Sequence, residues 1–263
     1  MTYFEVLFFF VVIPIIILAG AHVWHDKNNQ PISRQFDLLS PVFMLGLLVF
    51  VALIYTTPWD NYLVATSVWW YDSALVTGIV IGWVPIEEYT FFILQTLMTG
   101  LWVLLILRYI QLDAPFKPSA ALRKGSVAVV GVLWLSSIVI FMLDWRAGNY
   151  LGLTLIWALP PIALQVAVGA DILWHYRRWV AGMIVSATGY LCLVDAVGIG
   201  GGTWTINPEQ TTGVMIGILP VEEALFFLLT NILLVFGMVL GLSRLTHKRL
   251  PEQIKEWLPI RAD

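Results

Sequence analysis

Apolar residues dominate the chain in seven long stretches, and most charged residues lie in the short segments between them. A helix needs about 20 apolar residues to cross a hydrocarbon core roughly 30 Å thick. Backbone amides must be satisfied internally in that core, which helices of this length achieve. We therefore predict an all-α integral membrane protein with seven transmembrane helices. They span Phe4–Val23, Leu38–Thr57, Pro85–Leu107, Ser126–Leu143, Leu151–Ala170, Val180–Val197 and Pro220–Leu242.

Composition and charge agree with this architecture and predict its orientation. Hydrophobic residues make up 59% of the 263 residues and charged residues only 12%, which excludes an ordinary soluble domain. With seven crossings, Arg146 is the single basic residue on one side. Because basic loops stay in the cytoplasm, we expect a cell-membrane protein with its amino terminus outside and its carboxyl terminus in the cytoplasm. The basic residues on the cytoplasmic side are Lys27, Arg34, Arg108, Lys117, Arg123, Lys124, Arg177, Arg178, Arg244, Lys248, Arg249, Lys255 and Arg261.

An internal repeat relates the two halves of the chain. A shift of 135 positions aligns residues 60–92 with residues 195–227 without a gap and gives 11 identities in 33 positions. Apolar composition alone would not align Asp, Trp, Pro and paired Glu. The identical residues of the first copy are Asp60, Trp69, Thr77, Gly78, Ile81, Gly82, Pro85, Glu87, Glu88, Phe91 and Phe92.

The repeat predicts a 3+1+3 arrangement of the helices. Residues 1–110 form the first three-helix repeat, 111–150 the linker and fourth helix, 151–243 the second repeat, and 244–263 a cytoplasmic tail. Because a single helix connects the two three-helix repeats, both repeats begin on the same side of the membrane. They are then related by a pseudo-two-fold axis along the membrane normal. Repeats of this kind share a central site at their interface.

Each repeat is irregular before its last helix. Residues 73–107 would span about 50 Å as one straight helix, which is too long for the core. Gly78, Gly82 and Pro85 offer places to break it, since proline removes a helical amide bond. We predict a short half-inserted segment at Ala74–Val84, with the crossing beginning at Pro85, and the same from Gly213 to Pro220.

Two pairs of adjacent glutamates carry the chemical signal. They are Glu87 and Glu88, after Pro85, and Glu222 and Glu223, after Pro220. A proline followed by acids is ordinary at a helix start. Two copies at equivalent positions with apolar flanks favour function instead, since carboxyls at membrane depth are costly. Adjacent residues point about 100° apart on a helix, so we expect one acid of each pair to face the bundle axis and its neighbour to orient it.

Other residues at similar depth are candidate supports. Gln95, Thr230 and Asn231 add neutral polar groups on the motif helices. Asp60 and Asp195, at the outer helix ends, either hydrogen-bond the inner machinery or are solvated. For the outer aromatic residues, which we place in loops, an interfacial belt is the default and a lid over the site is the alternative. These aromatic residues are Trp59, Trp69, Trp70, Tyr71 and Trp204.

Three further features are interpreted as structural. Cys192, the single cysteine, excludes an internal disulfide and a thiolate metal cluster. His22 and His25, at the inner end of the first helix, are better explained as interface residues than as a metal pair. Residues 198–202 form a Gly-rich run without a preceding strand, which we interpret as a flexible loop rather than a nucleotide-binding turn. We therefore expect no metal site and no nucleotide cofactor.

The doubled Pro-x-Glu-Glu motif followed by Phe-Phe, on the third and seventh of seven helices, resembles the membrane-integral carotenoid (lycopene) cyclases. The resemblance covers essentially the whole chain, and both motif copies are intact. It implies that Glu87, Glu88, Glu222 and Glu223 form an acid–base site that consumes no flavin or nicotinamide. The implied partners are a linear carotenoid, membrane lipids and other enzymes of carotenoid synthesis, and not nucleic acid.

The residues suit this chemistry independently. Closing the end of a linear polyene requires a proton for the terminal alkene, stabilisation of the resulting cation, and removal of a ring proton. A carboxylic acid, a carboxylate base and aromatic faces in a dry site supply these needs. Crowded carboxyls at low dielectric retain a proton between them. The aromatic faces nearest the acids are Phe91, Phe92, Phe226 and Phe227, with Trp69 and Trp204 nearby.

Two other functions compete with an isomerising cyclase. A small transporter or proton-coupled channel would also use intramembrane acids and parallel repeats. It would need polar residues along its whole path, whereas the motif helices are mostly apolar below Glu88 and Glu223. A polyprenyl transferase would need separated aspartates for magnesium diphosphate. Ring type (β expected, ε or γ open), the number of ends closed, substrate length and the acid and base assignments stay open.

Overall fold

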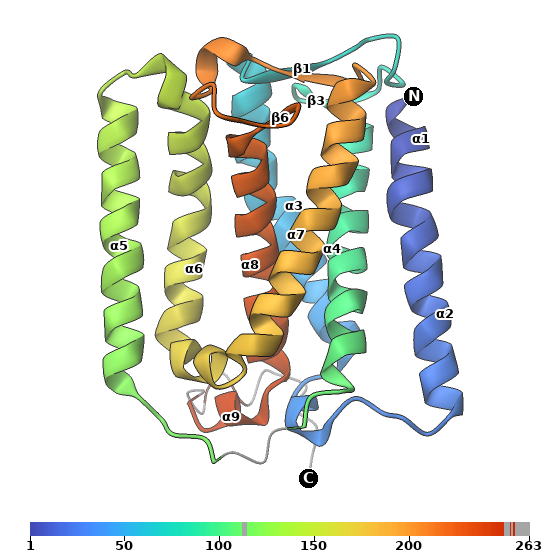
Figure 1. Ribbon diagram of the computed structural model, residues 1–263, viewed down its shortest axis with the longest axis vertical. Coiled ribbons are helices and arrows are strands. Elements are labelled where there is room, and N and C mark those ends of the chain that lie inside the picture. Colours follow the sequence, from blue (N-terminus) through green and yellow to red (C-terminus); the bar gives the residue numbers. More distant parts are fainter. Residues whose placement is uncertain (112–114, 250–252, 254, 256–263) are drawn as a thin grey trace.

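The computed structural model describes residues 1–111, 115–249, 253 and 255 (Figure 1). Within these residues, seven helices are long and apolar enough to cross a membrane, so the predicted all-α membrane fold is confirmed. The first crossing combines α1 (Tyr3–Leu7), a π-helical turn (Phe8–Val12) and α2 (Ile13–Lys27). The others are α3 (Pro41–Ala65), α4 (Ile86–Leu107), α5 (Ala120–Met142), α6 (Asn149–His175), α7 (Arg177–Gly200) and α8 (Val221–Leu242), followed by the short α9 (Arg244–His247).

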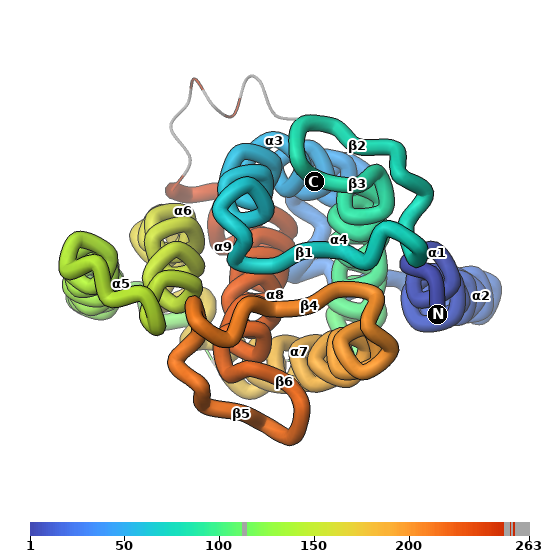
Figure 2. Tube along the Cα trace, turned by 90° about the horizontal axis from the view of Figure 1, so that it is seen from above, coloured from blue at the N-terminus to red at the C-terminus, as the bar shows by residue number. Residues whose placement is uncertain are grey.

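Short strands cover the end of the bundle at which the chain begins (Figure 1). There β1 (Trp69–Tyr71) pairs antiparallel with β4 (Trp204–Ile206), and the two run side by side across the bundle (Figure 2). The register pairs Trp70 with Thr205, which are equivalent positions under the 135-residue shift. The 3+1+3 arrangement itself stays a prediction, and this register is what a two-fold relation between the repeats would produce.

The segment before each motif helix differs from the prediction. In place of one short half-inserted segment, β2 (Val80–Ile81) pairs with β3 (Val84–Pro85), and β5 (Met215–Ile216) pairs with β6 (Leu219–Pro220). Gly82 and Gly217 make the turns with φ of +69° and +64°, which an L side chain resists. Pro85 and Pro220 therefore end strands, and α4 and α8 begin one residue later. The two hairpins project on opposite sides of the β1–β4 pair (Figure 2).

The Gly-rich run at residues 198–202 is not a flexible loop, so that interpretation was wrong. Gly198 and Gly200 belong to the last turn of α7. A Cβ on Gly198 would collide with the ring of Trp204. Glycine at position 198 lets the Trp204 ring pack directly against the α7 backbone. The sequence pattern did not reveal this contact.

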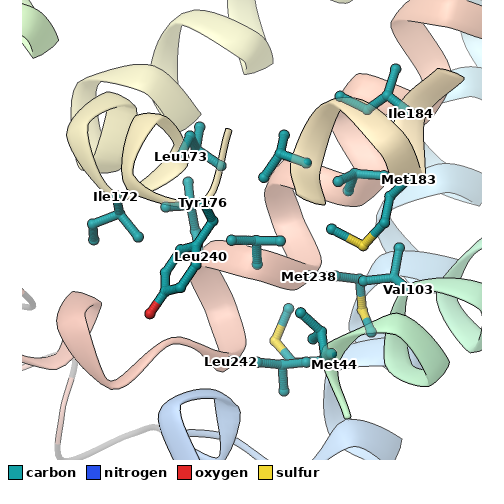
Figure 3. Packing of buried hydrophobic residues seen from close by; sticks show 14 of the residues in the cluster. Met44, Val103, Ile172, Leu173, Tyr176, Met183, Ile184, Met238, Leu240 and Leu242 are labelled. Atoms are coloured by element: carbon teal, nitrogen blue, oxygen red, sulfur yellow. The ribbon is translucent and has the colours of Figure 1, made fainter. Parts of the chain in front are cut away.

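The opposite half of the bundle holds the largest apolar core. Side chains from α3, α4, α6, α7 and α8 meet there, including Met44, Val103, Met183, Met238 and Leu242 (Figure 3). Nearby ion pairs tie this end together: Arg108 with Asp26 at 2.8 Å, Arg249 with Asp171 at 2.7 Å, and Arg244 with Asp37. Of the predicted cytoplasmic cations, Arg261 lies outside the described residues.

His22 and His25 take part in helix packing at this same end. His22 contacts the Leu101 carbonyl at 3.0 Å and Arg108 at 2.9 Å. His25 contacts Gln30 at 2.6 Å and Tyr109 at 2.9 Å. Each ring therefore uses both nitrogens within the helix interface.

Candidate active site

The starts of α4 and α8 determine where the four glutamates point. Pro85 and Pro220 occupy the N-cap positions and offer no side-chain cap. The first helical amides are satisfied by the hairpins instead: Ile86 N donates to Ile79 O, and Val221 N donates to Val214 O, both at 2.9 Å. Each hairpin is thus folded back over the beginning of its motif helix.

The first acid of each pair anchors its own hairpin. Glu87 Oε1 accepts a hydrogen bond from Thr77 N at 2.6 Å. Glu222 Oε1 accepts from Thr212 N at 2.7 Å and from the Thr212 hydroxyl at 2.6 Å. Both side chains are almost completely buried, and the second oxygen of each has no partner among the described residues. Neither lines the cavity described next, so these two acids support the loop.

The second acid of each pair lines a cavity beneath the β1–β4 pair, which we call the carboxyl cavity. Glu88 and Glu223 contribute its acids together with Asp195 of α7. Aromatic rings from α1, α4, α6, α8 and both strands form much of the remaining wall. Its lining is Tyr3, Val6, Leu7, Trp69, Tyr71, Glu88, Phe91, Tyr150, Leu191, Val194, Asp195, Trp204, Ile206, Glu223, Phe226 and Phe227.

Two tyrosine hydroxyls converge on Glu88. Tyr3 OH donates to Glu88 Oε2 at 2.6 Å, and Tyr71 OH donates to the same oxygen at 2.9 Å. Trp69 Nε1 donates to the Tyr71 hydroxyl at 3.0 Å and orients it. Burial first, and then the neighbouring Glu88 charge, raise the pKa of Tyr71 well above its ordinary value. The Tyr71 hydroxyl therefore remains a donor at neutral pH.

Glu223 has a different set of neighbours. The Tyr150 hydroxyl of α6 interacts with Glu223, and Asp195 is the acidic side chain with the largest electrostatic effect on it. Asp195 Oδ1 accepts from Trp204 Nε1 at 2.8 Å, and its Oδ2 has no partner in the described structure. Glu223 therefore lies among acidic neighbours without the paired donors that hold Glu88.

Asp60 and Asp195 are buried, so the solvation alternative at helix ends was wrong for both. They are only 1% and 5% exposed, because α3 and α7 extend several residues beyond them. Asp60 lies within electrostatic range of Glu88, and neither of its oxygens has a described partner. Asp60 lies outside the cavity lining, whereas Asp195 belongs to it.

The acids form a cluster without a compensating cation. Asp60, Glu88, Asp195 and Glu223 interact electrostatically, and none of the described residues lining the carboxyl cavity is basic. Several like charges in an apolar surrounding cannot all be ionised. The cluster therefore retains protons on some of its acids, and a proton held there is what proton donation requires.

The predicted aromatic residues divide between this cavity and a neighbouring one. Phe91, Phe226 and Phe227 line the carboxyl cavity, and Phe91 contacts Phe227 edge-on with ring centres 6.3 Å apart. Phe92 faces a second, apolar cavity instead. Phe92 does not line the carboxyl cavity, and its role as an aromatic face for the acids stays a prediction.

The outer aromatic residues also divide. Trp69, Tyr71 and Trp204 line the carboxyl cavity, as a lid would, while Trp70 is 44% exposed on the same strand as Trp69. Alternation along β1 explains this difference, since successive side chains point to opposite faces. Trp59 is not in a loop as expected, because it lies within α3.

The polar residues deeper in the bundle have separate roles. Gln95 lines the apolar cavity, and its Nε2 has no described partner. Asn231 accepts from the Thr99 hydroxyl at 3.1 Å and donates to the Phe227 carbonyl at 2.8 Å. Asn231 is thus a helix-packing residue remote from the acids.

Sequence reasoning missed Tyr3 and Tyr150 as members of the site. Each lies near the end of a crossing that the short strands cover, at the depth of the glutamates. That shared depth was the available signal. A tyrosine at a membrane interface is common, and periodicity alone gives no reason to direct it at an acid.

Comparisons with known proteins agree with these observations. A family model described as lycopene cyclase matches residues 1–106 and 149–240. The chain is 41% identical to a lycopene beta-cyclase of Halobacterium salinarum over an alignment of 203 positions, with 74% of this chain and 81% of that protein covered. It is 34% identical to a bifunctional lycopene cyclase/phytoene synthase of Podospora anserina over an alignment of 229 positions, with 81% of this chain and 39% of that protein covered. No solved structure matches the chain.

Proposed function

The chain belongs to the lycopene cyclase family, and we propose on this premise that it closes an end group of a linear carotenoid to a β-ring by proton transfer between Glu223 and Glu88. The observation that carries the proposal is the cluster of buried acids beneath aromatic rings, in a cavity whose described lining holds no basic residue. The reaction is an isomerisation, so the enzyme belongs with the intramolecular lyases.

The proposed steps balance without an external reagent. An acid adds a proton to the alkene carbon next to the terminal dimethyl carbon. The dimethyl carbon then becomes a tertiary cation. A neighbouring double bond attacks it, forms the ring C–C bond, and moves the positive charge into the ring. A base then removes a ring proton and leaves a new double bond. Since the protein supplies both acid and base, the mechanism needs no flavin, nicotinamide or metal.

Glu88 is the proposed base. Hydrogen bonds donated to a carboxyl group stabilise its ionised form, and Glu88 accepts them from both Tyr3 and Tyr71. Those two donors also fix the side chain, which matters because ring type depends on the carbon that loses its proton.

Glu223 is the proposed acid. Its acidic neighbours, Asp195 and Glu88, disfavour a further negative charge in the cavity. Glu223 is also buried, so a proton on it is available to an alkene rather than to solvent.

After each turnover the proton must return from Glu88 to Glu223. Asp195 interacts with both glutamates, and its free Oδ2 can accept or pass on a proton. We assign Asp195 this relay, with Trp204 as the residue that orients it.

The cation between the two steps is stabilised by aromatic faces. A cation near a π face gains about 0.5–2 kcal/mol per ring, most in a desolvated site. Phe91, Phe226 and Phe227 from the motif helices and Trp69 and Trp204 from the strands supply these faces.

The proposed orientation follows from charge. The described cations of α9 and of the ends of α2, α4 and α7 lie opposite the strands, and basic residues face the cytoplasm. The amino terminus and the carboxyl cavity then lie toward the outer surface of the cell membrane. A linear carotenoid dissolved in that bilayer is the proposed substrate, and other enzymes of carotenoid synthesis are proposed partners.

Expression in lycopene-accumulating bacteria tests the function. We expect cyclised pigments with β-end groups, identified by chromatography and absorption spectra. In heavy water each new ring should carry one solvent-derived deuterium at the carbon that the acid protonates. Persistence of linear lycopene, with the protein present in the membrane, would contradict the assignment.

A further inference from the structure

The carboxyl cavity continues into two further spaces. It shares Phe91 and Phe226 with the apolar cavity, which lies between α3, α4, α6 and α8. The apolar cavity shares Val51, Tyr55 and Trp157 with an open depression between α3 and α6, which we call the α3–α6 groove. A continuous row of lining residues therefore leads from Glu88 and Glu223 to the lipid-facing side of the bundle.

Side chains rather than close backbone contact close the seam between α3 and α6. The two helix backbones scarcely approach each other. Tyr55 OH donates to the Trp157 carbonyl at 2.8 Å, and Trp59 Nε1 donates to the Leu153 carbonyl at 3.0 Å. Trp59 also stacks on Trp157 with ring centres 4.6 Å apart. Rotation of a few aromatic side chains would open such a seam without separating the helices.

Prolines explain why these hydrogen bonds exist. Pro161 lies inside α6 and has no amide proton, so the Trp157 carbonyl four residues earlier loses its helical partner. The Tyr55 hydroxyl of the facing helix donates to this carbonyl in place of the missing amide. Pro58 interrupts α3 beside the same groove. Both walls are therefore locally weakened helices joined by side chains.

The corresponding interface between the two predicted repeats offers a comparison within the same molecule. A second depression, the α2–α7 groove, is lined by Pro14, Ile17, Leu18, Ala187 and Tyr190, among others. Tyr190 is equivalent to Tyr55 under the repeat and likewise donates to a carbonyl of the facing helix, that of Phe10, at 2.8 Å.

The α2–α7 groove does not continue inward. It has no lining residue in common with the carboxyl cavity or with the apolar cavity. Beside it, Asn231 accepts a hydrogen bond from the Thr99 hydroxyl at 3.1 Å and donates one to the Thr188 hydroxyl at 3.3 Å, which joins α4, α7 and α8. The two grooves thus look alike from the lipid, while only the α3–α6 groove leads to the acids.

We propose that the linear carotenoid reaches the acids sideways through the α3–α6 groove, with its reacting end in the carboxyl cavity and its remaining chain in the apolar cavity and the groove. This inference rests on the proposed function. A long, rigid conjugated chain cannot fold into the carboxyl cavity, so most of its length must stay in the apolar cavity or in lipid. The side chains that the spaces share are aromatic or aliphatic (Phe91, Phe226, Val51, Tyr55 and Trp157), which suits a polyene. The polar groups of the apolar cavity are scattered glutamines and threonines, and none of its described lining residues is charged.

Two matched cysteine variants test the route. Ile54 lies in the α3–α6 groove and Ile17 in the α2–α7 groove, with side chains 58% and 66% exposed. Each Ile→Cys change is made with Cys192→Ser and modified with a bulky apolar maleimide. Turnover of lycopene in vesicles is then compared with that of the same protein before labelling.

Labelling of Ile54→Cys should lower kcat/KM by about tenfold or more, because displacing a reacting group by an ångström can cost on the order of 10²-fold. Labelling of Ile17→Cys should change it by less than about twofold, since the adduct has no path to the acids. If Ile54→Cys folds poorly, Phe50→Cys in the same groove replaces it. Equal responses of the two grooves, or no response at either position, would overturn the route. Failure of unlabelled wild-type protein to cyclise lycopene would instead overturn the function itself.

Discussion

The two motif copies have the same backbone arrangement but different surroundings. In both, the threonine amide ten residues before the first acid donates to that acid, at 2.6 Å for Thr77 and 2.7 Å for Thr212. Both hairpins turn at an equivalent glycine. The second acids diverge, since Glu88 holds two tyrosine donors and Glu223 lies beside Asp195 and Tyr150.

The difference comes largely from residues outside the motif. Tyr3 lies at the start of the first crossing and Tyr150 at the start of the fifth, which correspond in the predicted 3+1+3 arrangement, whereas Tyr71 has no counterpart because residue 206 is Ile. A duplicated helix start thus supplies two similar carboxyls, and a tyrosine that only one copy has gives them unequal environments. One pair of identical acids can then perform opposite proton transfers, because environment rather than residue type sets the role.

The largest expected effect is on the second acids. Glu88→Gln and Glu223→Gln should each lower turnover by about 10²–10⁴-fold, the range for losing a general acid or base. Glutamine retains the volume but transfers no proton. Purified variants are assayed with lycopene, and gel filtration in detergent confirms that they fold. Near wild-type turnover in either variant would remove that residue from the mechanism.

The next largest effect on turnover is expected at one of the two buried aspartates, Asp195, and not at the other, Asp60. Asp195→Asn should slow steady turnover by about 10–10²-fold, below the full effect of a direct acid or base, because the relay acts only after ring closure. A rapid first turnover followed by slow ones is the expected signature in stopped-flow absorbance. Asp60→Asn, outside the cavity lining, should retain this steady rate within about tenfold. Equal losses in first and later turnovers would contradict the relay.

Removing the tyrosine hydroxyls should lower turnover by smaller factors, and more beside Glu88 than beside Glu223. A hydrogen bond to a charged group contributes about 1.5–3 kcal/mol, so Tyr3→Phe and Tyr71→Phe should each reduce turnover by about tenfold. Tyr150→Phe, beside a protonated acid, should cost about threefold. Steady-state rates of the three variants decide this comparison, and equal effects at all three positions would argue against a charged Glu88.

The pH dependence of one variant sharpens the same comparison. Because the pKa of Tyr71 is raised above its ordinary value, the hydroxyl stays protonated from neutral pH up to at least about pH 10. The ratio of wild-type to Tyr71→Phe turnover should therefore be constant between about pH 6 and 9. A ratio that falls toward one as pH rises would show that the hydroxyl ionises in this range.

The smallest effect on chemistry is expected at the first acids. Glu87→Gln and Glu222→Gln weaken the bond that anchors each hairpin, which should cost about 1–3 kcal/mol of stability. Thermal unfolding in detergent measures this loss, while turnover below the unfolding temperature should remain within about tenfold. Unchanged stability combined with abolished turnover would assign these acids to the chemistry instead.

The sequence predicted much of this fold because bilayer physics leaves few choices. Apolar length alone located the crossings, and the doubled motif marked the acids. The pairing of β1 with β4 was missed because three-residue strands have no usable periodicity. The depth of Asp60 was misjudged because helix ends are poorly defined by hydropathy. The convergence of Tyr3 on Glu88 joins residues 85 positions apart, and such long-range contacts are fixed by packing that a single sequence does not display.

Deuterium exchange into unreacted substrate tests the division of labour between Glu88 and Glu223 most directly. Each Glu→Gln variant is incubated with lycopene in heavy water, and the recovered linear pigment is analysed by mass spectrometry. Without its base, Glu88→Gln should still protonate the terminal alkene, and the cation should return to lycopene by losing a proton to Glu223. Lycopene recovered from Glu88→Gln should therefore gain deuterium, whereas lycopene recovered from Glu223→Gln should gain none. Deuterium in neither pigment, or only in that from Glu223→Gln, would contradict the assignment of Glu223 as acid and Glu88 as base.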